Sequence, residues 1–319
     1  MTRTKRTVFA VIVAVTVLAG ACGSDDGDSS GSADDFEGMS LTIGSKNFTE
    51  QYVLSEILIQ GLIARGAEVT DRTDTGDTPT TRAALLGGEI DAYWEYNSTG
   101  WVEHLGNGSP DDDAEELTDD VRAADRQNGI EWLGRSTFND TYGFAVGPEL
   151  AADVAPTRVR VDKFDLDDMA DYLEDDGDAV VCVEPEFPDR ADGLTLFEDN
   201  TGFVVPRSQL RVFDDAGDVY SAVQSGECDF GEVFTTDGRI DSLDLTLVVD
   251  GGVFYVYNVS LNIPTAVYQQ APEAFDDLVG DILRPLSQVR MTALNREVTD
   301  GVPVSQVAAR YLDTFEINP

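Results

Sequence analysis

Leu41-Thr-Ile-Gly-Ser-Lys-Asn-Phe-Thr-Glu-Gln51 is the stretch of sequence that decides how the chain is expected to fold. Its first residues predict a short buried strand, and Gly44 predicts a turn after it. Asn47 and Glu50 have the spacing of a capping box, and Thr49 is a second candidate for the N-cap. The stretch therefore predicts a strand, a turn and the start of a helix.

Polar side chains occupy the junction between this strand and this helix. Apolar residues recur at helical spacing after the junction, and Gly66 ends the run. Ser45, Lys46 and Asn47 are therefore expected where the carboxyl end of a strand meets the amino end of a helix. Ligands bind at this place in open α/β sheets, although an ordinary turn between a strand and a helix shows the same pattern.

The composition favours an exported, soluble protein of about two domains. The chain has 319 residues, 42% of them hydrophobic, and a formal net charge of −40. This length is typical of about two domains, and the hydrophobic content is sufficient for a core. A strongly acidic surface repels nucleic acid and anionic membrane surfaces, so neither is expected as a partner.

The N-terminus predicts export and anchoring. Residues 1–21 combine a basic start with an apolar run that is short for a membrane span, as in a signal peptide. Small residues before Cys22 resemble a bacterial lipobox and predict lipidation of Cys22, with a plain cleavage site as the alternative. Residues 22–37 are rich in Gly, Ser and Asp and are expected to form a flexible tether. We therefore expect an extracytoplasmic protein, lipid-anchored to the outer face of the bacterial cytoplasmic membrane.

Two cysteines remain beyond the tether. Cys182 and Cys228 both fall in predicted strands, and in an exported protein they can form a disulfide; two buried thiols are the alternative. His104 is the single histidine, and the sequence contains no CxxC motif. We therefore expect no metal site and no cofactor.

Strand and helix patterns alternate along the rest of the chain, which predicts an α/β fold with largely parallel sheets. Strands are expected at 68–73, 90–96, 130–133, 143–146, 179–183, 228–234, 245–249 and 253–262. Helices are expected at 78–86, 117–128, 166–173, 194–198, 219–223, 272–283, 287–298 and 304–315. Thr78, which precedes a proline, is expected to cap the first of these helices, and Asp165 the third.

Two segments of the sequence repeat each other. Residues 88–100 contain Gly-Glu-Ile-Asp followed by Tyr96 and a closing glycine, and residues 226–238 contain Gly-Glu-Cys-Asp followed by Phe234 and a closing glycine. The two segments lie 138 residues apart throughout. If the match is more than chance, the chain has two similar lobes, with Tyr96 and Phe234 facing each other across a cleft.

Aromatic residues gather at the predicted ends of strands. Any single one is more simply a core residue, but several in both halves of the chain favour a lined cleft. A quaternary ammonium ion has no N–H group to donate, so π faces and carboxylates are what can hold it. Asp140 could add charge, and Lys46, Asn47, Gln51 or Arg190 could bind a carboxylate at the other end of a zwitterion. The aromatic residues concerned are Tyr93, Tyr96, Tyr142, Phe234, Tyr255 and Tyr257.

Motifs of catalysis are missing from the sequence. It contains no GxSxG motif, no P-loop and no GxGxxG motif in a suitable context. A pair of carboxylates of the glycosidase type is the generic enzymatic option that remains, and acidic residues are so frequent here that any such pair is weak support. We therefore expect no catalytic residues and no enzyme activity.

Five blocks of sequence together resemble one known family. They are GSKNFTEQ at 44–51, GEIDAYWEY at 88–96, FNDTY at 138–142, EFPDRADGL at 186–194 and TDGRI at 236–240. In this order they resemble the osmoprotectant substrate-binding proteins of ABC importers, of the glycine betaine, carnitine and choline type. The similarity runs from about Leu41 to the C-terminus, and its first block is the most specific.

The resemblance implies a two-lobed periplasmic-binding-protein fold of type II. Each lobe would be a mostly parallel sheet flanked by helices, with the ligand in the cleft between the lobes. The family commonly has Tyr where this chain has Phe234, so the π face is kept while a hydrogen bond is lost. By position the ligand-binding residues would be Gln51, Tyr96, Thr99, Asp140, Tyr142, Phe234 and Tyr257, with Lys46, Asn47 and Arg190 as further polar candidates.

The resulting hypothesis is a solute-binding protein that captures a quaternary ammonium osmoprotectant and delivers it to the permease subunits of an ABC transporter. Lobe 1 would comprise residues 38–140 and 258–319, and lobe 2 residues 141–257, with a hinge where the chain crosses near Tyr142 and Tyr257. Two alternatives stay open at this point: an extracytoplasmic hydrolase with a carboxylate pair, and a ligand sensor of the same fold.

Overall fold

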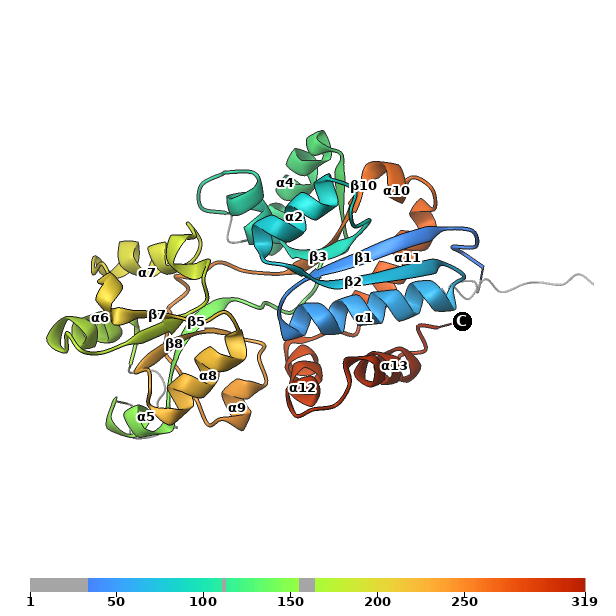
Figure 1. Ribbon diagram of the computed structural model, residues 1–319. Coiled ribbons are helices and arrows are strands. Elements are labelled where there is room, and N and C mark those ends of the chain that lie inside the picture. The colour runs from blue at the N-terminus through green and yellow to red at the C-terminus, as the bar shows by residue number, and fades with distance from the viewer. Residues whose placement is uncertain (1–33, 111–112, 155–163, 319) are drawn as a thin grey trace, which may run out of the picture.

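Two bodies of sheet and helix make up the protein, and the chain passes between them twice (Figure 1). The computed structural model describes residues 34–110, 113–154 and 164–318. The predicted signal peptide, Cys22 and most of the predicted tether lie outside these residues. Within the described part of the chain, no helix has the length and the apolar character needed to cross a membrane.

The first body opens with the strand and helix predicted from residues 41–51, except that the strand continues through Gly44, where a turn was predicted, to Lys46. β1 (Ser40–Lys46) pairs in parallel with β2 (Glu68–Gly76), and α1 (Thr49–Ala64) connects them. α1 is buried along most of its length because it contacts this sheet on one side and the C-terminal helices on the other (Figure 1). α2 (Thr78–Leu86) follows β2 and packs against both strands.

A second sheet completes the first body with the help of the C-terminal part of the chain. β10 (Val259–Pro264) lies between β3 (Tyr93–Tyr96) and β4 (Ile130–Leu133) and pairs antiparallel with both. An isolated parallel bridge from Ile43 to Ala92 links the two sheets. The chain therefore leaves the first body after β4 and returns to its centre at β10.

The second body holds a five-stranded sheet in the order β7-β6-β8-β5-β9. β6 pairs in parallel with β7 and β8, whereas β5 pairs antiparallel with β8 and β9. The prediction of parallel pairing thus holds within the repeating strand and helix units, while β5 and β10, which follow the crossings, add antiparallel pairs. The bounds are β5 Tyr142–Val146, β6 Val181–Val183, β7 Leu210–Val212, β8 Phe230–Phe234 and β9 Thr246–Leu247.

The remaining helices cover the sheets of both bodies. In the first body they are α3 (Asn97–Thr99), the π-helical η1 (Gly100–His104), α4 (Ala114–Asp125), the 3-10 turn η2 (Arg126–Asn128), α10 (Thr265–Tyr268), α11 (Pro272–Leu283), α12 (Gln288–Thr299) and α13 (Val304–Thr314). In the second body they are α5 (Pro148–Val154), α6 (Leu166–Asp175), the 3-10 turns η4 (Phe187–Asp189) and η5 (Arg207–Gln209), α7 (Leu194–Thr201), α8 (Ala216–Ser225) and α9 (Arg239–Ser242).

The repeat seen in the sequence is also a repeat of structure. Asp91 accepts a hydrogen bond from the backbone N–H of Thr42 at 2.7 Å, and Asp229 accepts one from Val180 at 2.8 Å. Asp91, which precedes β3, thereby holds β1 in place, and Asp229, which precedes β8, holds the start of β6. The glycine that ends the preceding helix region has a positive φ in both copies, +72° at residue 88 and +73° at residue 226. The two lobes therefore share the same local contacts and backbone conformation at these positions, as well as a similar sequence.

The two crossing segments lie against each other. The backbone N–H of Asp140 donates to the carbonyl of Tyr257 at 3.1 Å, and the hydroxyl of Thr141 donates to the carbonyl of Tyr255 at 2.9 Å. The strand predicted over 253–262 begins only at Val259, because residues 253–258 run alongside the first crossing segment instead of joining a sheet.

The predicted helix caps need correction at two places. α1 begins at Thr49 after Phe48, which makes no side-chain cap, so the proposed capping box of Asn47 and Glu50 is wrong. The carboxyl of Glu50 instead points to groups of other elements, described below. α2 is capped by Asp77, whose side chain accepts from the N–H of Thr80, and not by Thr78. Asp165, in contrast, forms a full capping box with Asp168 at the start of α6.

The folded part of the chain begins before the predicted end of the tether. Phe36 is fully buried, and its ring lies 4.9 Å from that of Phe275 in α11. The backbone N–H of Phe36 also donates to the carbonyl of Arg65. Residues 36 and 37 therefore belong to the first body, and the expected tether is shorter than predicted.

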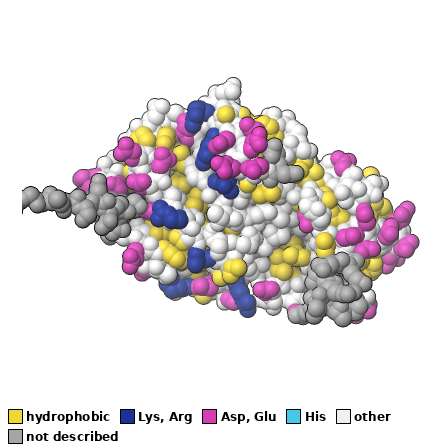
Figure 2. All heavy atoms as spheres, turned by 180° about the vertical axis from the view of Figure 1, so that it is seen from behind, with side chains coloured by type: hydrophobic (Ala, Val, Ile, Leu, Met, Phe, Trp, Pro, Cys, Tyr) yellow, Lys and Arg dark blue, Asp and Glu magenta, His cyan; other side chains and the backbone are white. Residues whose placement is uncertain are grey.

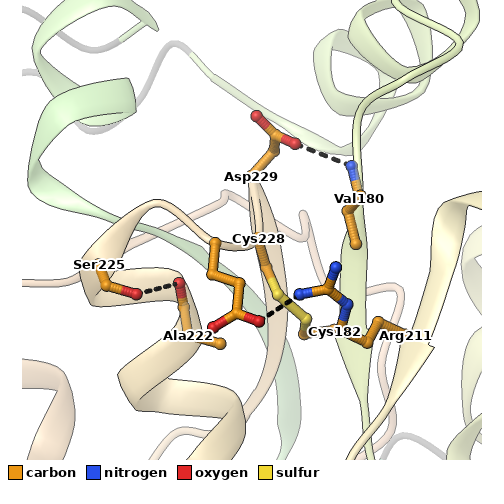
Figure 3. Close-up of a disulfide and its surroundings, with 8 residues drawn as sticks. Val180, Cys182, Arg211, Ala222, Ser225, Cys228 and Asp229 are labelled. Atoms are coloured by element: carbon orange, nitrogen blue, oxygen red, sulfur yellow. Dashed lines mark hydrogen bonds and ion pairs between the residues drawn. A yellow bond between two sulfur atoms is a disulfide. The ribbon is translucent and has the colours of Figure 1, made fainter.

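The two cysteines of the second body form a disulfide (Figure 3). Cys182 lies in β6, and Cys228 lies in the turn before β8, two residues earlier than a strand position. Their Cα atoms are 6.0 Å apart, which suits a disulfide and confirms the predicted pairing. The bond links neighbouring parts of one sheet beside the Asp229–Val180 contact.

Acidic side chains spread over both bodies on the face shown in Figure 2. This distribution agrees with the formal net charge of −40. Since charge of one sign keeps proteins apart, the surface suits a soluble protein.

Candidate ligand-binding site

Five aromatic rings form a closed circuit where the two bodies meet. Phe48 and Tyr96 come from the first body, Tyr142 and Phe234 from the second, and Tyr257 from a crossing segment. Neighbouring ring centroids are 6.4 Å apart for Tyr96–Tyr257, 5.4 Å for Tyr257–Tyr142, 5.4 Å for Tyr142–Phe234, 5.0 Å for Phe234–Phe48 and 6.2 Å for Phe48–Tyr96. These five residues, here called the aromatic circuit, line a cavity of about 40 Å³.

The dimensions of the aromatic circuit suit a small cation. The face of an aromatic ring attracts a cation within about 6 Å of the ring centroid. A planar pentagon with sides equal to the mean of the five distances has its centre about 5 Å from each corner, which is inside this range. The three tyrosines are buried, and the two phenylalanines are partly exposed. The circuit is therefore closed on its tyrosine side and reaches solvent on its phenylalanine side.

A buried network of polar groups joins the two bodies beside the circuit. The carboxyl of Glu50 in α1 accepts from the hydroxyl of Tyr96 at 2.8 Å and from the side-chain amide of Asn295 at 3.1 Å. The hydroxyl of Thr236, which follows β8, lies 2.5 Å from Glu50 Oε2 and 2.6 Å from Asp140 Oδ1. Thr236 therefore connects a helix of the first body with a crossing segment.

The network requires a proton on one of its two carboxyls. A hydroxyl has one hydrogen to donate, so Thr236 can donate to Glu50 or to Asp140, and the other short contact needs a protonated carboxyl as its donor. Burial, together with the charge of Asp140, raises the pKa of Glu50 well above its ordinary value. Burial raises the pKa of Asp140 to about 6. One proton is thus held where the two bodies meet.

Lys46 belongs to a second buried network, which is charged. Its Nζ lies 2.6 Å from Glu95 Oε1, and His104 Nε2 lies 2.8 Å from Glu95 Oε2. Burial alone would raise the pKa of Glu95, but Lys46 and His104 lower it below its ordinary value. The Lys46 ammonium also lies 5.1 Å from the ring centroid of Tyr96. The cation that faces the cavity is therefore already paired.

Arg190 supports the cavity from behind the circuit. Its guanidinium lies 5.7 Å from the ring centroid of Tyr142 and donates to both carboxylate oxygens of Asp192, at 2.7 and 2.8 Å. It also donates to Glu186 at 2.7 Å and to the hydroxyls of Thr78 and Thr99. Arg190 holds residues of both bodies together but does not line the cavity.

Three glutamates of the second body form the acidic side of the cavity: Glu184, Glu186 and Glu232. Glu232 lies in β8, and Glu184 directly follows β6; the backbone N–H of Glu184 donates to Glu232 Oε2 at 2.8 Å. Burial, with a nearby glutamate, raises the pKa of Glu184 to about 7 and the pKa of Glu232 well above its ordinary value.

Residues 39–314 match the family described as the substrate binding domain of ABC-type glycine betaine transport system. The chain belongs to this family.

Individual relatives support the assignment. The glycine-betaine-binding protein of Pseudomonas aeruginosa is 32% identical over 282 residues, which cover 85% of this chain and 86% of that protein. The glycine betaine-binding protein YehZ of Escherichia coli is 28% identical over 280 residues, covering 85% and 89% of the two chains. The solved structure of apo YehZ superposes with a TM-score of 0.60 at 26% identity and covers 86% of this chain and 98% of that one. The glycine betaine family is thus supported by sequence and by fold.

Most residues predicted for the ligand site of this glycine betaine-family protein lie together. Gln51 and Arg190 do not line the cavity: the side-chain oxygen of Gln51 accepts from the backbone N–H of Lys46, and Arg190 acts as described above. Eight of the ten predicted residues line it: Lys46, Asn47, Tyr96, Thr99, Asp140, Tyr142, Phe234 and Tyr257. That they contact a ligand stays a prediction.

The structure adds five residues that the sequence prediction missed: Phe48, Thr78, Glu184, Glu186 and Glu232. The pattern of β8 held one usable signal, because side chains alternate across a strand and Glu232 therefore shares a face with Phe234. Phe48 lies within the stretch that decides the fold, but the sequence prediction considered only the polar residues before it. Among the described residues, no group of three or more His, Cys, Asp or Glu side chains is arranged to hold a metal ion.

Proposed function

We propose that this chain captures a quaternary ammonium osmoprotectant outside the cytoplasm and delivers it to the permease subunits of an ABC transporter. Its family comprises substrate-binding domains of such transport systems, and the relatives named above are glycine betaine-binding proteins. The family supports the transport role, and the aromatic circuit supports the chemical class of the ligand.

The observation that carries the proposal is the closed aromatic circuit at the junction of the two bodies. A trimethylammonium group spreads its charge over methyl groups and donates no conventional hydrogen bond, so aromatic faces suit it better than carbonyl groups do. A primary ammonium ion needs three acceptors arranged around its nitrogen. The cavity brings five aromatic rings together beside its hydroxyl and carboxyl groups.

We also propose that the two bodies are the lobes predicted from the sequence, with boundaries near residues 140 and 258, and that they close on the ligand. The circuit takes residues from both bodies, so a ligand inside it would contact both. Small-angle scattering with and without a saturating ligand tests this. A smaller radius of gyration with ligand supports closure, and an unchanged scattering profile contradicts it.

The proposal includes a lipid anchor at Cys22 after removal of residues 1–21. Small residues before Cys22 and the Gly/Ser/Asp-rich segment after it support this. Cys22→Ser should release the protein from membranes and leave ligand binding intact. Continued membrane retention of this variant would contradict the anchor.

The proposal is tested by thermal unfolding of the wild-type protein against a panel of glycine betaine, choline, carnitine, proline betaine and unmethylated amino acids. A ligand that binds only the folded state raises the unfolding midpoint. We expect an increase with at least one quaternary ammonium compound and none with the amino acids. Conversion of any panel member into a product would favour the hydrolase, and binding without an associated permease would favour the sensor.

A further inference from the structure

Of the two cations near the cavity, Arg190 has no donor left for a ligand, and the charge of Lys46 is already paired. Arg190 has five N–H donors. Nε donates to Asp192, one NH2 group donates to Thr78 and Glu186, and the other donates to Thr99 and Asp192. Every donor of Arg190 is therefore in use. Lys46 is buried against Glu95, with 2.6 Å between the charged atoms.

The acidic side of the cavity is not balanced in the same way. Glu186 is paired with Arg190, but within the described part of the chain neither Glu184 nor Glu232 has a Lys, Arg or His nitrogen within 4.0 Å. Glu232 is only 3% exposed, and its alternation with Phe234 along β8 points it to the same side as the circuit. The raised pKa values of Glu184 and Glu232 agree with this lack of a neutralising partner.

An acidic groove extends the cavity beyond these glutamates. It has a volume of about 330 Å³ and shares Asn47, Glu184 and Glu186 with the cavity. Its other polar walls include Asp77 from the first body and Asp214 from the second, and no Lys or Arg of the described residues lines it. A ligand arm that leaves the aromatic circuit on this side thus meets carboxylates on both walls.

We propose that Glu184 and Glu232 form a specificity subsite that selects a quaternary ammonium cation with a hydrogen-bond-donating arm, such as a hydroxyl, over a zwitterion with a carboxylate arm. This inference rests on the proposed function and narrows its ligand class. Within that class, choline is the simplest compound with a donor arm, and glycine betaine is the simplest with a carboxylate arm.

The physical reason is the different pairing that each arm finds. A hydroxyl can donate to a carboxyl oxygen of either glutamate, whether that glutamate is ionised or protonated, and the hydrogen bond is stronger to the ionised form. A carboxylate arm meets glutamates instead, with Arg190 saturated and Lys46 paired. Ionised glutamates repel this arm, and the arm can be accepted only while the glutamates hold a proton.

Isothermal titration calorimetry of the full chain with three probes tests the inference. The probes are choline, the methyl ether of choline, and glycine betaine. The ether keeps the cation but has no donor, so it separates charge from hydrogen bonding. We expect choline to bind at least about 10-fold more tightly than glycine betaine and several-fold more tightly than its ether.

Two neutral substitutions locate the effect. Glu184→Gln and Glu232→Gln keep the size of the side chain and remove its ability to ionise, and each should reduce the preference for choline over glycine betaine by about 5-fold or more. Glu149→Gln, an exposed substitution on α5 of the same body, is the matched control and should leave the preference unchanged. Unfolding midpoints confirm that the variants fold.

The outcomes separate this inference from the function on which it rests. Glycine betaine binding as tightly as choline in the wild type overturns the inference but not the proposed function. An ether that binds as tightly as choline, or an unchanged preference in both folded glutamate variants, also overturns it. If no quaternary ammonium ion binds at all, the proposed function fails together with the inference.

Discussion

Glu50 and Glu95 are both buried, and both contact Tyr96, yet their surroundings shift their pKa values in opposite directions. Glu95 accepts from the backbone N–H of Tyr96 at 2.8 Å, and Glu50 accepts from its hydroxyl at 2.8 Å. Glu95 has Lys46 and His104 as partners, which lower its pKa. Glu50 faces neutral donors and the acidic Asp140, and its pKa is raised.

The comparison shows that partners, rather than burial, decide the charge of these carboxyls. The partners of Glu95 all belong to the first body, so its charge is part of a fixed framework behind Tyr96. The partners of Glu50 include Thr236, which follows a strand of the second body, and its neighbour Asp140 lies in a crossing segment. The group that holds a proton is thus the one placed between the two bodies.

The largest effect is expected from breaking the charged network. Glu95→Gln leaves Lys46 buried without its partner, and loss of one member of a buried ion pair costs about 3–5 kcal/mol. Urea unfolding at pH 7 measures this loss. The double variant Lys46→Met with Glu95→Gln is the control and should recover much of the stability, because no unpaired charge remains. A single variant as stable as the wild type would contradict the fixed charge of Glu95.

The proton-holding network should respond to pH in a defined direction. Because the pKa of Asp140 is raised to about 6, the folded protein keeps a proton that the unfolded chain releases above about pH 4. Stability from this pair is therefore present below about pH 4 and is lost as the pH rises through about 6, by roughly 2–3 kcal/mol. Glu95 has the opposite sign, since its contribution is lost only as the pH falls below its ordinary pKa.

Asp140→Asn isolates the contribution of Asp140 to the pH dependence of stability. The variant cannot titrate at this position, so the wild type should lose stability relative to it between pH 4 and pH 7 in urea unfolding. A constant difference across this range, or one that moves the other way, would show that Asp140 does not take up a proton between pH 4 and pH 7.

A smaller effect is expected when Glu50 itself is neutralised. Glu50→Gln replaces a carboxyl whose pKa is raised well above its ordinary value with an amide that can still donate to Thr236. The change in stability at pH 7 should stay below about 1 kcal/mol, in contrast to Glu95→Gln. Equal losses in the two Gln variants would remove the distinction on which the comparison rests.

Much of the fold could be predicted from the sequence because its signals are local. The βα unit around Leu41–Gln51 and the three C-terminal helices follow from periodicity and turn residues. The disulfide between Cys182 and Cys228 was one of two options that the sequence left open. The two similar segments that lie 138 residues apart could be recognised in the sequence, and the contacts of Asp91 and Asp229 give the structural reason for their similarity. Antiparallel insertion of β10 was not predictable, because it depends on where a returning chain meets the first body.

The residues of the candidate site also divide into those that the sequence could predict and those that it could not. Tyr96, Tyr142 and Phe234 were predicted because they lie at strand ends, where a cleft is expected. The carboxyl of Glu50 was assigned to a local cap because its spacing suited one, but contacts with distant residues determine its place. The saturation of Arg190 was likewise not predictable, since Thr78 and Thr99 come from the other body.

The central claim is that the aromatic circuit binds a cation through its π faces, and one calorimetric comparison tests it most directly. Choline is titrated against the neutral alcohol in which tert-butyl replaces trimethylammonium, a group of nearly the same size. Cation–π attraction of about 0.5–2 kcal/mol per ring predicts that choline binds at least about 10-fold more tightly. Tyr142→Ala should weaken choline binding by about 2- to 30-fold, and Tyr142→Phe by less, because the face remains. Equal affinities for choline and the alcohol, or wild-type binding by Tyr142→Ala, would contradict the claim.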